Sequence, residues 1–112
     1  MKVHSYKNSS GKDLILEYID TLEEEEQVDA FSVLELMELG EFDKIFYKKW
    51  EKKIYEVYFR KHNRIFYVIA EGENIYLLHA CRKQKNKTEK NDKKIVVKRA
   101  KELGQLLGKK FV

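Results

Sequence analysis

Three runs of β-branched and aromatic residues between positions 54 and 81 constrain the fold of this chain more than any other feature. They cover 54–59, 65–70 and 75–81, and short polar breaks at 60–64 and 71–74 separate them. Residues of these types favour strands, and breaks this short suit hairpins between neighbouring strands. The sequence therefore predicts a three-stranded antiparallel meander.

Helical spacing of apolar residues appears on both sides of this meander. A first helix is predicted from Lys12 onward and a second over about 24–39, where Glu23 to Glu26 suit the positive helix start and Gly40 is a natural stop. A last helix is predicted over about 92–107, with Asp92 as a candidate N-cap. We assign five acids to the solvent side of the first two helices: Glu17, Asp20, Glu24, Glu35 and Glu38.

A short first strand at 3–6 completes the order β-α-α-β-β-β-α. This order predicts one α+β domain over 1–112, with helices packed on one face of a small sheet. Phe46 and Trp50 are interpreted as core or subunit contacts.

Charge is strongly segregated along the chain. Residues 13–43 hold twelve acids and no Lys or Arg, whereas residues 82–110 hold twelve Lys or Arg against three acids, a local balance of +9. A basic segment of this kind attracts a polyanion, and an acidic helical region repels one. A solvated charged face is the simpler explanation of the same pattern.

Several classes of protein are disfavoured by what the sequence lacks. No run of eighteen apolar residues predicts a transmembrane helix, and the first residues have no apolar signal region. Cys81 has no second cysteine to pair with, which suits a reducing compartment, so a cytoplasmic protein is expected. His4, His62 and His79 are scattered, and no metal-ligand spacing or nucleotide-binding motif occurs, so no metal and no cofactor are predicted.

Three segments resemble a known family. They are 53–57 (KIYEV), 63–67 (NRIFY) and 77–88 (LLHACRKQKNKT), and in order and spacing they are similar to the phage-related HigB-type toxins of the RelE/ParE superfamily. The opening Ser10-Gly11-Lys12 with its helical stripe and the stretch from Leu34 to Gly40 resemble the same family.

The resemblance implies a RelE/ParE-type fold and the toxin role of a type II toxin–antitoxin system. Members of the family cleave mRNA on the ribosome, and a helix-turn-helix (HigA-like) antitoxin encoded beside them neutralises them and carries any binding to promoter DNA. By position, Arg64, Tyr67, Lys83 and Lys87 match family residues. The chain departs from the family at Tyr58, where arginine is common, and at Gln84 and Glu89.

Metal-free RNA cleavage needs a base for the 2′-hydroxyl, cations for the charged phosphorane and an acid for the 5′-oxygen. The catalytic candidates are Arg64, Lys83, Lys87, Arg60, Tyr67, Glu56 and His79. The RNA-binding candidates are Arg82, Lys85, Lys90, Lys93 and Lys94. Lysines alternate at 83, 85 and 87, which would place three ammonium groups on one side of a continued strand, an arrangement that a polyanion relieves.

Each candidate also has a structural explanation. Glu56 could be the cross-strand partner of a lysine, His79 a hydrogen-bonded half-buried residue and Tyr67 a core residue. In an uninterrupted strand Arg64 and Tyr67 face opposite sides, so both reach one phosphate only through a bulge or if Arg64 stands at the loop end. Two other functions stay open: a ParE-like toxin that inhibits gyrase, and a relative that binds nucleic acid without cutting it.

Overall fold

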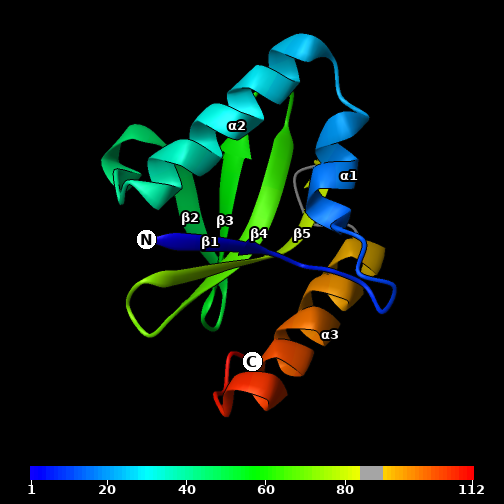
Figure 1. Cartoon of the computed structure of the whole chain (residues 1–112), viewed down its shortest axis with the longest axis vertical. Coiled ribbons are helices and arrows are strands. Elements are labelled where there is room, and N and C mark those ends of the chain that lie inside the picture. Colours follow the sequence, from blue (N-terminus) through cyan, green and yellow to red (C-terminus); the bar gives the residue numbers. More distant parts are fainter. Residues whose placement is uncertain (84–89) are drawn as a thin grey trace.

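The computed structural model describes residues 1–83 and 90–112. Its centre is a five-stranded sheet in the order β1-β5-β4-β3-β2 (Figure 1). The predicted meander is confirmed: β3 (Ile54–Phe59), β4 (Asn63–Ala70) and β5 (Asn74–Arg82) pair antiparallel.

Two further strands extend the meander at its edges. β1 (Lys2–Ser5) pairs in parallel with β5, and β2 (Phe46–Glu51) pairs antiparallel with β3. The sequence did not predict β2. An edge strand is held by backbone hydrogen bonds on one side, so four of its six residues are exposed and the hydrophobic pattern is weak.

The helices begin and end where local chemistry favours it. In α1 (Leu14–Asp20) the Asp13 side chain accepts the first free N–H groups, and α2 (Glu24–Glu38) opens with a capping box formed by Glu23 and Glu26. A short 3-10 turn, η1 (Phe42–Lys44), leads into β2. The last helix, α3 (Lys90–Leu107), places Asp92 in its first turn, so the prediction of Asp92 as N-cap was wrong.

Helices cover both faces of the sheet, which corrects the expectation of one covered face. Alternate residues of β4 separate two cores: Ile65 and Tyr67 pack with α1 and α2, whereas Phe66 and Val68 pack with Val96 of α3. Figure 1 shows α1 and α2 together and α3 apart from them, at the other end of the molecule. We call the side that carries Phe66 the α3 face.

A β-bulge shapes the α3 face. Phe66 pairs with His79 and Tyr67 pairs with Leu77, so β5 contains one extra residue, Leu78. Leu78 packs in the α3-side core, and the His79 ring stacks on Phe66 with centroids 6.4 Å apart. The bulge therefore places two consecutive residues of β5 on the same side.

In the part of the chain that the structure describes, no helix combines the length and the apolar character needed to span a bilayer.

Candidate nucleic-acid interface

The α3 face carries a group of charged and aromatic side chains beyond the region that α3 covers. We call it the Tyr58 cluster, and its members are Lys48, Glu56, Tyr58, Arg64 and Lys83. Lys48 and Glu56 are directly opposite each other on β2 and β3, and Arg64 is opposite Tyr58 on β4. Cross-strand partners point to the same face of a sheet, which is why residues far apart in sequence meet here.

The Glu56 carboxylate is the anchor of the cluster. It is 1% exposed and accepts hydrogen bonds from the Tyr58 hydroxyl and from Arg64 Nη1, the latter at 2.9 Å. Lys48 Nζ lies 3.6 Å from the same carboxylate. The prediction that Glu56 is the cross-strand partner of a lysine is confirmed, and the carboxylate also fixes the orientation of two further side chains.

Three cations surround the Tyr58 ring. Lys48 Nζ, Arg64 Cζ and Lys83 Nζ lie 5.5, 5.9 and 5.8 Å from its centroid. With one buried carboxylate against three cations, the cluster has a net charge of +2. It therefore attracts anions.

The hydroxyl of Tyr58 lies between a lysine and a carboxylate. Burial, together with its hydrogen bond to Glu56, raises the pKa of Tyr58. Its hydrogen bond with Lys48 raises the pKa of that lysine. Both groups thus keep their protons at neutral pH, and Lys48–Tyr58–Glu56 forms a continuous chain of proton donors and acceptors.

Exposure divides the cluster into two layers. Lys48 is 59% exposed, Lys83 and Tyr58 are partly exposed, and the Arg64 side chain is only 2% exposed. Arg64 also lies over the Phe66 ring, with Cζ 5.4 Å from its centroid. Arg64 therefore binds Glu56 in the buried layer of the cluster, and the two lysines form the exposed layer that a ligand would contact.

His79 lies on the same face but is engaged on both sides of its ring. Nε2 is 2.7 Å from Asp92 Oδ1, and Nδ1 is 3.4 Å from Arg99 Nη1. Its side chain is 13% exposed. This confirms the prediction of a hydrogen-bonded, half-buried histidine, and the contacts tie the first turn of α3 to β5.

The same location brings together three side chains that can bind metals. Ligand atoms of His79, Cys81 and Asp92 all lie within 4.8 Å of one another, although the sequence has no such spacing motif. Burial raises the pKa of the Cys81 thiol to about 12, and Asp92 already bonds to His79. Arg99 adds positive charge beside the imidazole. These contacts favour a structural role over a metal site: hydrogen bonds of His79 with Asp92 and Arg99 hold α3 on β5, and we call this group the clamp.

The clamp predicts a pH dependence of stability. Burial lowers the pKa of His79, and the hydrogen bond to Asp92 only partly opposes this. An unfolded histidine binds a proton near pH 6.5, so the unfolded chain gains protons first as the pH falls. We expect the free energy of unfolding to fall between about pH 7.5 and pH 5.5, and His79→Gln to flatten this fall. Urea midpoints at both pH values test this, and equal falls in both proteins would contradict it.

Other predicted site residues lie away from the cluster. The Arg60 backbone N–H bonds to Asp29 and its guanidinium pairs with Glu25 at 3.0 Å, so it turns to α2 although it follows Tyr58 by two residues. Arg82 pairs with Glu26 of α2 at 2.8 Å. Tyr67 is 1% exposed in the α1–α2 core, as the packing explanation predicted, and faces away from Arg64.

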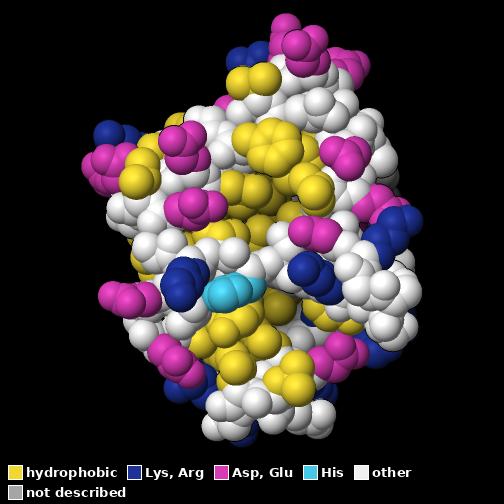
Figure 2. All heavy atoms as spheres, viewed as in Figure 1, with side chains coloured by type: hydrophobic (Ala, Val, Ile, Leu, Met, Phe, Trp, Pro, Cys, Tyr) yellow, Lys and Arg dark blue, Asp and Glu magenta, His cyan; other side chains and the backbone are white. Residues whose placement is uncertain are grey.

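The acidic helices make the opposite side of the molecule unsuited to a polyanion. Figure 2 shows Asp and Glu side chains surrounding an apolar surface over α1 and α2. The solvent-side prediction is confirmed for Glu17, Asp20, Glu24, Glu35 and Glu38, all of which are exposed. Arg60 and Arg82 are paired within this acidic surface.

The remaining basic candidates belong to the last third of the chain. Lys85 and Lys87 lie outside the described residues. Lys90, Lys93 and Lys94 are exposed at the start of α3, and Lys93 pairs with Glu51 of β2 at 3.2 Å.

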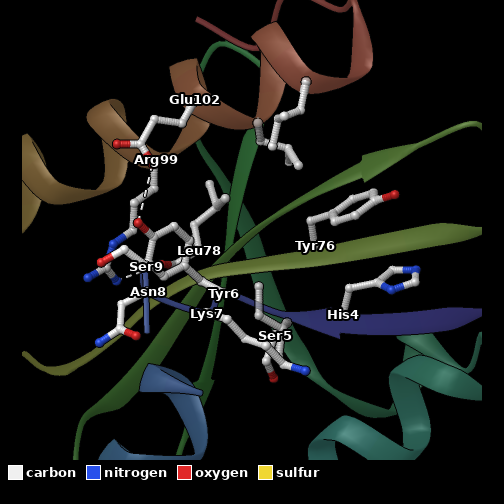
Figure 3. Close-up of a pocket in the computed structure, with 13 residues that line it drawn as sticks. His4, Ser5, Tyr6, Lys7, Asn8, Ser9, Tyr76, Leu78, Arg99 and Glu102 are labelled. Atoms are coloured by element: carbon white, nitrogen blue, oxygen red, sulfur yellow. Dashed lines mark hydrogen bonds between the residues drawn. The ribbon is translucent and has the colours of Figure 1, made fainter. Parts of the chain in front are cut away.

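A separate hollow of about 620 Å³ lies between β1 and α3 (Figure 3). Two of its charged groups are engaged within the protein: Arg99 lies 4.2 Å from the Tyr6 ring centroid and bonds to the Leu78 carbonyl, and Glu102 accepts a hydrogen bond from Tyr6. The other walls are mixed and include Lys7, Asn8, Leu103 and Leu106. The Glu102 carboxylate in the wall disfavours a phosphate.

Two cluster members were not among the predicted site residues: Tyr58, which was noted as a departure from the family pattern, and Lys48. Lys48 lies on β2, and without that strand its position opposite Glu56 could not be inferred. The sequence signal for β2 was the alternation of Phe46, Lys48 and Trp50, which share a face of the strand. Trp50 packs edge-on against Phe66 with ring centroids 5.0 Å apart, which confirms the prediction that Trp50 is a core residue.

Comparison with known proteins adds one finding. A family model described as phage derived protein Gp49-like (DUF891) matches residues 17–101, which is well over half of the chain. The match includes every described residue of the Tyr58 cluster. A search of curated proteins found no match.

Proposed function

We propose that this protein is a toxin that cleaves RNA without a metal at the Tyr58 cluster. The chain belongs to the Gp49-like family of phage-derived proteins, which is the family of HigB-like toxins. One observation carries the proposal: two surface lysines, Lys48 and Lys83, lie next to Tyr58. The Tyr58 hydroxyl donates a hydrogen bond to the buried Glu56 carboxylate. Family membership supports the toxin role, and the geometry supports the chemistry.

The lysines supply the charge. Lys48 and Lys83 both lie within 6 Å of the Tyr58 ring centroid, and Lys48 also bonds to the hydroxyl, so a phosphate bound beside that hydroxyl would lie near both ammonium groups. The phosphorane formed during cleavage carries more negative charge than the starting diester. Fixed cations at this position therefore stabilise the transition state more than the bound substrate.

Tyr58 and Glu56 supply the path for the proton. The 2′-oxygen attacks phosphorus as its proton passes to the Tyr58 oxygen and the tyrosine proton passes to Glu56. The bond from phosphorus to the 5′-oxygen breaks, and that oxygen takes a proton from one of the lysine ammonium groups. The products are a 2′,3′-cyclic phosphate and a 5′-hydroxyl, and water restores both protein groups.

Two partners follow from this proposal. The substrate is mRNA, met on the ribosome, and a cognate helix-turn-helix antitoxin would keep the toxin silent by binding it. Binding of that kind lowers the concentration of free toxin by mass action. Any contact with promoter DNA would be made by the complex of the two proteins.

Purified protein added to translating ribosomes is expected to cut the message and leave 2′,3′-cyclic phosphate ends. Tyr58→Phe should slow cutting by about 100-fold, because it removes the proton path and keeps the ring. An mRNA with a single 2′-deoxy nucleotide at a mapped cut site should resist cleavage there. Inhibition of translation with intact message, or unchanged cutting by Tyr58→Phe, would contradict the proposal; a supercoiling assay with gyrase would then test the ParE-like alternative.

A further inference from the structure

Phe46 is among the most exposed apolar side chains of the described residues, at 80%. It was interpreted as a core or subunit contact, and the structure shows that it is not part of the core. Isolated exposed apolar residues are common on protein surfaces. Phe46, however, lies on β2 directly opposite Tyr58 and two residues before Lys48, so it shares a face with the Tyr58 cluster.

The position of Phe46 extends the cluster in one direction. Lys48 lies two residues after Phe46 on β2, and Lys83 approaches the Tyr58 ring from the β5 side of the sheet. Phe46, directly opposite Tyr58, adds an uncharged ring at the start of β2. Phe46 and Tyr58 also border a hollow of about 410 Å³, but its lining includes Asp29, Ser32, Val33 and Leu36 of the acidic helix α2, and Arg60 there is paired with Glu25. The subsite therefore rests on the exposed Phe46 ring and its place beside Tyr58, and not on this hollow.

We propose that Phe46, together with Tyr58, forms a stacking subsite for an unpaired nucleobase next to the phosphate held by the cluster, so that the protein selects single-stranded RNA. The inference rests on the proposed function, because it takes the Tyr58 cluster as the phosphate site. An aromatic ring beside fixed cations matches a chain that alternates flat bases with phosphates. The same cations disfavour a basic protein segment as the occupant.

Selection of single strands follows from the stacking itself. In an RNA helix both faces of each base are covered by neighbouring bases, so a protein ring cannot reach them. An unpaired base exposes its face and can be swung onto Phe46. The phosphate contacts are available in either form, so Phe46 should affect discrimination rather than all binding.

The test measures binding without cleavage. Three fluorescent probes of equal length are compared by anisotropy at one low salt concentration: a 2′-O-methyl single strand, its duplex, and an abasic strand with the same backbone. Phe46→Ala is expected to weaken binding of the single strand about tenfold or more, and to leave the duplex and abasic strand within about twofold. Phe46→Trp should retain or strengthen single-strand binding.

Phe31→Ala is the matched control, because Phe31 is an exposed phenylalanine, at 47%, on the acidic helix α2. It should leave all three affinities unchanged, and thermal unfolding should show both alanine variants folded. Equal weakening of all three probes by Phe46→Ala would overturn the stacking subsite. So would no change in the affinity for any probe.

Cleavage is assayed separately so that the two proposals can fail independently. If wild-type protein cuts no RNA and Phe46→Ala still loses single-strand binding, the subsite stands and the nuclease proposal falls. If wild-type protein cuts RNA and Phe46→Ala binds all probes normally, the nuclease proposal stands and the subsite falls.

Discussion

Replacement of Arg64 by methionine is expected to lower the free energy of unfolding by about 3–5 kcal/mol, because it leaves a buried carboxylate without its main counter-charge. Glu56 is 1% exposed and Arg64 2% exposed, so water cannot replace the lost partner. Urea unfolding followed by circular dichroism gives the change directly.

Two controls separate this effect from a simple loss of packing. Lys48→Met removes an exposed cation from the same carboxylate and should cost about 1 kcal/mol or less. Combining Arg64→Met with Glu56→Leu should restore part of the stability, since no buried charge remains unpaired. A loss below about 1 kcal/mol for Arg64→Met, or a double variant less stable than the single one, would show that the pair does not hold the cluster together.

The largest effect on activity is expected when both surface lysines, Lys48 and Lys83, are replaced together. Under the proposed function, Lys48→Ala and Lys83→Ala should each slow RNA cleavage by about 100-fold, and the double variant should slow it further, because each removes a cation near the proposed phosphate position. The measurement is the rate of single-turnover cleavage on translating ribosomes. Lysine-to-arginine replacements should retain part of the rate, as they keep the charge.

Lys12→Ala is the matched control for these variants. Lys12 is 61% exposed and pairs with Glu17, while Lys48 is 59% exposed and lies near Glu56, so the two lysines differ chiefly in location. The control should cut RNA at the wild-type rate and unfold at a similar temperature. If Lys12→Ala slowed cleavage as much as Lys48→Ala, general electrostatic attraction would explain the result, and the cluster would lose its assigned role.

The predictions for the helices and the meander succeeded because their signals are local. Strand residues at 54–59 and breaks at 60–64 and 71–74 specify hairpins over a few residues, and the Gly40 stop and the acidic opening of α2 do the same for a helix. The first strand, predicted at 3–6, is confirmed as β1, but its parallel pairing with a segment about seventy residues away was not predicted. The other edge strand, β2, was missed because it buries little apolar surface.

The sequence indicated which types of residue form the candidate site, but not which individual residues belong to it. Sequence reasoning identified Glu56, Arg64 and Lys83, which the structure brings together, and also Arg60, Arg82 and Tyr67, which it places elsewhere. A charged side chain at a strand end can turn to either face. For Arg60 and Arg82 the acids of α2 decided the direction.

The sequence by itself determined the meander, the three helices and the presence of a cationic segment, because hydrophobic periodicity, capping residues and turn residues act within a few positions of one another. Only the tertiary structure decided that Lys48 meets Glu56, that Arg64 is buried behind Tyr58 and that Phe46 lies open beside them. Those relations depend on strand register and on which helix covers which face, and both are set by packing between distant segments.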